Sequence, residues 1–161
     1  HGREKVRAFA AEFVGELAAK KKWICSPLVL ALMRPFAGRE AVEAMRDFVG
    51  PLLDYIVEAK ERGEDALWYD APLMMVFQGS PYASPADPVI AATYAVLAAQ
   101  SLGLGSCMIG TVVPFVKQSR RLREKYGMRA NGRDGIAVVF GYPAVSYRRA
   151  VKRTFAHVDF G

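Results

Sequence analysis

The chain has few of the residues from which most metal sites and catalytic triads are built. Its 161 residues include two cysteines and two histidines, and His1 and His157 lie at or near the ends. Cys25 and Cys107 are far apart and form no metal-ligand pattern. We also find no hydrolase triad and no phosphate-binding Walker loop. These absences predict no metal site, and they favour a reaction in which a bound cofactor does the chemistry.

Long apolar runs are absent as well. The longest strongly apolar run, residues 89–99, is too short to span a bilayer. The N-terminal region has no signal-peptide pattern, since residues 3–22 alternate apolar and charged positions at helical spacing. A chain of this size does not need disulfides. We therefore expect a cytoplasmic protein with no membrane partner.

The composition indicates one folded domain over residues 1–161. Hydrophobic residues make up 52% of the chain, which argues against disorder. The net charge of +6 favours anionic partners such as nucleotides, nucleic acid or a membrane surface. No aromatic residues alternate with the basic residues at 120–125, and no nucleic-acid motif accompanies them. We therefore expect a solvated helix face there and no nucleic-acid partner. That cluster contains Arg120, Arg121, Arg123 and Lys125.

Apolar residues at helical spacing predict most of the secondary structure. Pro51 lies inside the third predicted helix and should kink or divide it. Gly63 and Gly127 are suited to end helices. We expect helices over 3–22, 27–34, 39–62 and 114–126, and a further one capped by Asp87 with Pro88 in its first turn.

Two continuous apolar runs, 73–77 and 136–140, predict buried strands. Two strands do not make a stable sheet by themselves. If the chain has only these two strands, further ones must come from sequence outside it or from a second subunit.

The most distinctive stretch is 91–110, where an Ala-rich helix runs into a glycine-rich loop. The helix has almost no polar face, which predicts burial on all sides. Gly103, Gly105 and Gly110 allow the following backbone to lie close to a flat or bulky group. This pattern indicates a cofactor platform, although a helix end followed by a tight turn has the same spacing.

Three segments of the chain resemble the nitroreductase family of FMN-dependent oxidoreductases. They are the helix and loop at 91–110, the Asp-Ala-Pro-Leu-Met-Met-Val run at 70–76, and the Gly-Tyr-Pro strand end at 141–143 with Tyr-Arg-Arg at 147–149. The resemblance is good over 66–155 and limited to helical character over 1–65. It is closest to a subgroup in which a ferredoxin-like domain comes first. The arginine-rich motif at the start of the family is missing, so we expect the N-terminal part of the family fold to be absent.

The resemblance implies an α+β fold, with a central, mostly antiparallel sheet flanked by helices, in a homodimer. It implies ping-pong electron transfer through bound FMN, from NAD(P)H or reduced ferredoxin to a nitroaromatic, quinone or related small-molecule acceptor. A non-catalytic flavin-binding relative with a regulatory or assembly role is the alternative. A small basic protein that binds nucleic acid ranks below both.

The resemblance also implies which residues hold the cofactor, and it identifies no catalytic side chain. The backbone of Met108, Ile109, Gly110 and Thr111 would lie beside the flavin ring. Guanidinium groups bind phosphate oxygens through paired hydrogen bonds. The phosphate would therefore be held by Arg149, with Lys152 and Arg153 as alternatives, unless this segment is a solvated basic tail.

Other side chains near these motifs have less specific roles. Cys107 has apolar neighbours, which predicts a buried structural thiol rather than a nucleophile. Residues 63–69, including Trp68 and Tyr69, and also Tyr82, are candidates for lining a substrate groove, but they are equally suited to packing.

Overall fold

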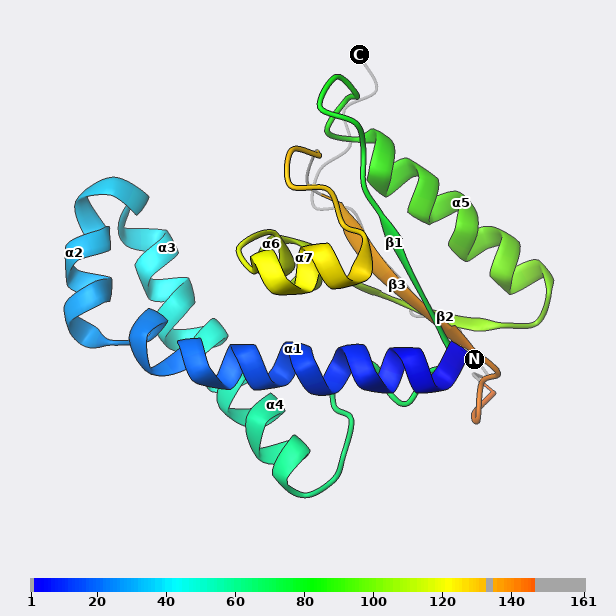
Figure 1. Cartoon of the computed structure of the whole chain (residues 1–161), viewed down its shortest axis with the longest axis horizontal. Coiled ribbons are helices and arrows are strands. Elements are labelled where there is room, and N and C mark those ends of the chain that lie inside the picture. The colour runs from blue at the N-terminus through cyan, green and yellow to red at the C-terminus, as the bar shows by residue number, and fades with distance from the viewer. Residues whose placement is uncertain (1, 133–134, 147–161) are drawn as a thin grey trace, which may run out of the picture.

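The computed structural model describes residues 2–132 and 135–146, and within them it is a three-stranded antiparallel sheet between two helical layers (Figure 1). The strand order is β1-β3-β2, with β1 at Leu73–Phe77, β2 at Gly105–Ile109 and β3 at Ile136–Gly141. Helix α5 covers one face of the sheet, and α1, α6 and α7 lie on the other face. The predicted α+β class is confirmed.

The helices are α1 (Gly2–Ile24), α2 (Pro27–Ala37), α3 (Arg39–Ala44), a π-helical turn η1 (Met45–Val49), α4 (Gly50–Glu61), α5 (Asp87–Ser101), α6 (Val112–Lys117) and α7 (Arg120–Tyr126).

The central strand β3 divides the core into two parts. Ala137 and Val139 pack into the cluster beneath α1, while Val138 and Phe140 pack beneath α5. Alternate side chains of a strand point to opposite faces, so one buried strand serves both cores. The predicted burial of this strand is confirmed.

Strand β1 is in the predicted place but is not buried as predicted. Leu73 and Met75, which are paired with Phe140 and Val138 and share their face of the sheet, are both 45% exposed. The reason is that β1 is an edge strand, which α5 covers incompletely. A continuous apolar run predicts a strand, but it does not show which faces will be covered.

Strand β2 lies where the sequence indicated a loop. It pairs with β3 along its whole length, from Gly105 opposite Gly141 to Ile109 opposite Ala137. The condition for borrowed strands, a chain with only two strands of its own, is therefore not met, since the described residues alone supply three. Its five residues, Gly-Ser-Cys-Met-Ile, do not alternate between apolar and polar side chains, and the glycines around them resemble a loop.

A fully buried tryptophan connects α1 to the rest of the core. The ring of Trp68 meets Phe9 and Phe13 edge to face, with centroid distances of 5.7 and 5.0 Å. Its indole N–H donates a hydrogen bond to Met74 Sδ at 3.1 Å. These contacts satisfy the one polar atom of the ring and fix α1 on the sheet. Of the two roles that the sequence allows for Trp68, lining a groove or packing, the structure shows packing in the core.

The turn that carries Trp68 is held by carboxylates. The side chain of Asp65 accepts hydrogen bonds from the backbone N–H groups of Trp68 (2.8 Å) and Asp70 (3.0 Å). Tyr69 and Asp70 have φ angles of 56° and 51°, a left-handed conformation that is costly for residues other than glycine. Arg7 holds Asp70 with two hydrogen bonds of 2.5 and 2.7 Å. Side chains thus compensate for the strained backbone.

The helical region 39–62 divides close to the predicted proline. The helix widens into the π turn η1 and resumes as α4, with Pro51 in its first turn. Proline has no backbone N–H and its ring clashes with the preceding helical turn, so a change of helix geometry here is expected. Gly63 ends the region with a φ of 76°, as predicted.

Three other helix boundaries differ from the predictions. Helix α2 continues to Ala37, through Pro35. The predicted helix 114–126 is two helices that separate at Ser119, whose hydroxyl accepts a hydrogen bond from the N–H of Leu122 and caps α7. Asp87 is the first residue of α5 rather than its cap, and its carboxylate accepts from the N–H of Ser84.

Helix α5 is largely exposed, which contradicts the predicted burial on all sides. Only Pro88, Ala92 and Ala99 are buried. The sheet covers one side of the helix, and no described residue covers the other. The exposed apolar side, called here the α5 outer face, carries Ile90, Tyr94 and Leu97.

We predict that Trp68→Ala lowers the free energy of unfolding by about 3–5 kcal/mol, the usual cost of removing a large buried aromatic side chain. Denaturant unfolding measures the change. Tyr82→Ala is the control, because Tyr82 is 96% exposed and its loss should cost under about 0.5 kcal/mol. Equal effects of the two substitutions would contradict the role given to Trp68.

A second prediction concerns Glu12, which joins α1 to α7. Its carboxylate accepts hydrogen bonds from Lys125, Arg121 (3.2 Å) and Tyr126 (3.3 Å). The Lys125 hydrogen bond is the main cause that holds the pKa of Glu12 below its ordinary value. A lowered folded-state pKa stabilises the fold above the ordinary Glu pKa, and this contribution is lost as the pH falls through the folded value.

We therefore expect Glu12→Gln to lower the melting temperature at pH 7. The difference between the variant and the wild type should shrink once the pH is well below about 4.3, the ordinary Glu pKa. Thermal unfolding across this range measures it. A difference that does not change with pH would show that the ion pairs do not stabilise the fold.

Candidate functional site

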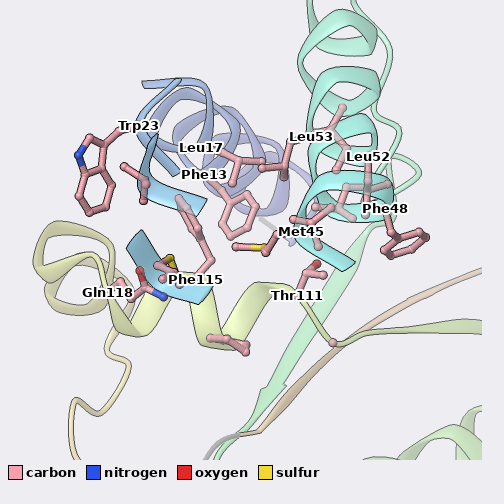
Figure 2. Close-up of a pocket in the computed structure, with 17 residues that line it drawn as sticks. Phe13, Leu17, Trp23, Met45, Phe48, Leu52, Leu53, Thr111, Phe115 and Gln118 are labelled. Carbon is pink, nitrogen blue, oxygen red and sulfur yellow. The ribbon is translucent and has the colours of Figure 1, made fainter. Parts of the chain in front are cut away.

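A pocket of about 500 Å³ lies where five segments of the chain meet (Figure 2). Helix α1 contributes Phe13 and Leu17, and α2 contributes Val29 and Met33. The π turn and α4 form another wall, and Leu67 and the segment from Gly110 to Gln118 complete the lining. Helices α2 and α3 lie beyond the C-terminal end of α1, away from the sheet (Figure 1), so the pocket lies at the junction of this helical arm with the core.

The pocket is almost entirely apolar. Aromatic and aliphatic side chains form most of its lining, and no charged side chain is among the described residues that line it. The polar side-chain groups in the lining are the hydroxyl of Thr111, the amide of Gln118 and the indole N–H of Trp23. A cavity of this size with apolar walls and few polar groups is typical of a small-molecule site.

Of the residues predicted to lie beside a flavin ring, Gly110 and Thr111 line this pocket. Ile109 points into the α1 core, and Met108, the preceding residue of the same strand, shares a face with Val138 on the α5 side. The alternation of β2 thus sends these two side chains to opposite faces and away from the pocket. A backbone contact with a cofactor stays a prediction for all four residues. Three further predicted cofactor residues, Arg149, Lys152 and Arg153, lie outside the described residues.

Gly110 is exposed and has open space around it. A Cβ added to Gly110 would meet no atom within 4 Å, and its backbone does not have the left-handed conformation that favours glycine. At Gly135, in contrast, a Cβ would lie 1.8 Å from the carbonyl oxygen of Phe77. The fold therefore requires the glycine at 135 but not at 110. The open backbone at Gly110 suits the close approach of a flat ring.

The aromatic groove candidates do not form this pocket. Trp68 is buried in the core, and Tyr69 and Tyr82 are exposed outside the pocket lining. Within 63–69 it is Leu67 that lines the pocket. Sequence reasoning missed the walls because their apolar residues have the same helical spacing as core residues. They include Phe13, Met45, Phe48 and Phe115.

The cysteines have no evident role at the site. Cys107 is exposed, which contradicts the prediction of a buried thiol, because β2 is an edge strand. Within the described part of the chain, no group of three or more His, Cys, Asp and Glu residues is arranged to hold a metal ion. In the same residues no helix has both the length and the apolar character needed to cross a membrane.

The nearby cations mostly have partners within the chain. Lys20 lies 5.2 Å from the ring centre of Phe115 and pairs with Glu16 at 3.7 Å, so it borders one wall of the pocket. In the cluster at 120–125, Arg120 pairs with Glu124, Arg121 and Lys125 pair with Glu12, and Arg123 donates to the carbonyl of Lys117. These pairs explain the cluster as part of the helix packing.

A second hollow of about 510 Å³ lies between α1, α4 and the 63–70 turn. Its charged groups are committed to the fold, since Arg7 holds Asp70 and the Lys60 ammonium donates to the carbonyl oxygen of Ala11 at 2.9 Å. The apolar pocket beside Gly110 is therefore the better candidate for a functional site.

Comparison with known proteins gives one match. The model of the nitroreductase family matches residues 4–142. The match includes the N-terminal helices, for which the sequence showed only helical character in common with the family. No curated protein and no solved structure matches the chain.

Proposed function

Because the chain belongs to the nitroreductase family, whose members carry out flavin-dependent oxidoreduction, we propose that it binds FMN with the ring beside Gly110 and Thr111. The observation that carries this proposal is the open backbone of Gly110 at the edge of an apolar pocket. The apolar dimethylbenzene end of the flat ring fits such walls, and backbone amide groups can orient its polar end.

The phosphate of FMN needs a cation that the pocket lining does not supply. Within the part of the chain that the structure describes, no Lys or Arg lines the pocket. We propose Arg149, with Lys152 and Arg153 as alternatives, for this contact, as the resemblance to the family implies.

When bound, FMN supplies the redox chemistry, and the protein binds it, orients it and limits its contact with water. We propose nitroaromatic, quinone or related acceptors, with NAD(P)H or reduced ferredoxin as donor. The apolar pocket supports this choice, since such acceptors carry aromatic or conjugated rings. We also propose a cytoplasmic location, where both donors occur.

We further propose that the protein is a homodimer. The α5 outer face leaves Ile90, Tyr94 and Leu97 more than half exposed on one side of the helix. A second stripe follows α2 at Leu28, Leu32 and Phe36, which are all strongly exposed. Large exposed apolar patches mark interaction surfaces. A second copy of the chain that covers them would give α5 the burial that its sequence predicts.

Gly110→Ala tests the cofactor site. We expect the added methyl group to weaken FMN binding by about tenfold, or about 1.4 kcal/mol, because it occupies the space where the ring would lie. Stability should change by under about 0.5 kcal/mol, since nothing in the fold contacts the new methyl group. Titration of the protein with FMN, followed by flavin fluorescence, measures the affinity.

The matched control is Gly15→Ala, in α1 and outside the pocket lining, which should leave FMN affinity unchanged. Equal FMN affinity of Gly110→Ala and the wild type would place the ring elsewhere. FMN binding without turnover by any donor would favour the non-catalytic alternative.

The dimer is tested by Tyr94→Glu combined with Leu97→Glu. We expect sedimentation velocity to show a dimer for the wild type and a monomer for this variant, because two buried carboxylates oppose the contact. Tyr82→Glu, which adds a charge at an exposed site in the loop before α5 and not on the α5 outer face, should stay dimeric. A monomeric wild type that retains flavin would contradict the proposal.

A further inference from the structure

The π turn η1 is an irregular element that faces the pocket. Of its five residues, Met45, Phe48 and Val49 line the pocket. Turns of π helix inside α-helices are frequent at functional sites, since the extra residue redirects side chains. Pro51 follows directly and prevents an ordinary α-helical continuation.

The same turn separates charge from the pocket. Its two charged residues, Arg46 and Asp47, do not line the pocket. They bind each other through two hydrogen bonds of 2.6 and 2.9 Å. The turn therefore presents a thioether, an aromatic ring and an aliphatic side chain to the pocket and keeps its ion pair outside.

The turn also lies close to the proposed ring site. In Figure 2, Met45 and Phe48 lie on the side of the pocket where Thr111 is drawn, whereas Trp23 and Gln118 lie on the other side. A compound that contacts a ring placed beside Thr111 would therefore also contact Met45 and Phe48. Met45 points towards Phe13, and Phe48 lies at the pocket edge with 66% of its surface exposed.

An apolar wall of this kind favours neutral compounds over ions. An ion that enters an apolar pocket loses its water without gaining a partner, whereas a neutral ring loses little. Methionine and phenylalanine side chains adapt to ring faces of different shape. The net charge of +6 would attract anions to the surface, so a preference for neutral compounds would have to come from the pocket itself.

We propose that Met45 and Phe48 of the π turn determine specificity by admitting uncharged ring compounds to the pocket and excluding anionic ones. The inference deepens the proposed function and rests on it for the reaction. Binding itself is measured separately, on the oxidised protein without a donor.

The experiment is equilibrium dialysis of the full chain against 1-nitronaphthalene and against 4-nitronaphthalene-1-sulfonate, which adds one negative charge to the same ring system. We expect the neutral compound to bind about tenfold more tightly. Phe48→Glu should weaken binding of the neutral compound by about fivefold, because it places a carboxylate at the pocket edge. Tyr55→Glu is the matched control, since Tyr55 is an exposed aromatic residue of α4 outside the pocket lining, and its substitution should have no effect.

A second variant keeps the test valid if Phe48→Glu fails to fold. Met45→Trp fills part of the pocket with a larger apolar side chain. It should therefore lower the affinity for 1-nitronaphthalene without adding charge. Equal or tighter binding of the sulfonate by the wild type would overturn the inference, and so would unchanged affinity in both pocket variants.

Flavin retention is measured on the same samples. Charge discrimination without bound flavin would support the pocket inference and contradict the proposed cofactor. Bound flavin without charge discrimination would support the proposed cofactor and contradict the pocket inference.

Discussion

The arrangement depends on the packing of α1 against Trp68. Phe9 and Phe13 meet the indole ring edge to face, and the turn that carries the indole is fixed by Asp65 and by the Arg7–Asp70 pair. Phe13 also contacts Phe115, with the ring centres 4.8 Å apart, and it lines the apolar pocket. One aromatic cluster thus joins α1, the sheet and the wall of the candidate site, so a change in the core would reach the pocket through Phe13.

The register of β2 decides what the most distinctive stretch of the sequence can do. Strand alternation sends Met108 to the α5 side and Ile109 into the α1 core, and the chain then leaves the sheet at Gly110. Where the strand has ended, the exposed backbone of Gly110 lies at the edge of the pocket. The same stretch therefore serves as a sheet strand and as a border of the candidate site.

The sequence predicted the elements better than their surroundings. Helix α1, strand β3 and the ends at Gly63 and Gly127 follow from local rules of periodicity and backbone conformation, and all are confirmed. The predicted burial of α5 and β1 is wrong because apolar composition does not show which faces of an element the rest of the chain covers. Strand β2 was missed because its flanking glycines resemble a loop. Met45 and Phe48 could not be identified as pocket residues, since only the tertiary fold separates a cavity wall from a core position.

The account as a whole requires that this chain binds a flavin at an apolar pocket with no charged lining. The most direct test is to incubate the purified protein with FMN, remove free FMN by gel filtration and record the visible absorbance of the protein peak. We predict flavin absorbance that elutes with the protein in the wild type and is diminished in Gly110→Ala. A correctly folded wild-type protein that elutes without flavin would contradict the account.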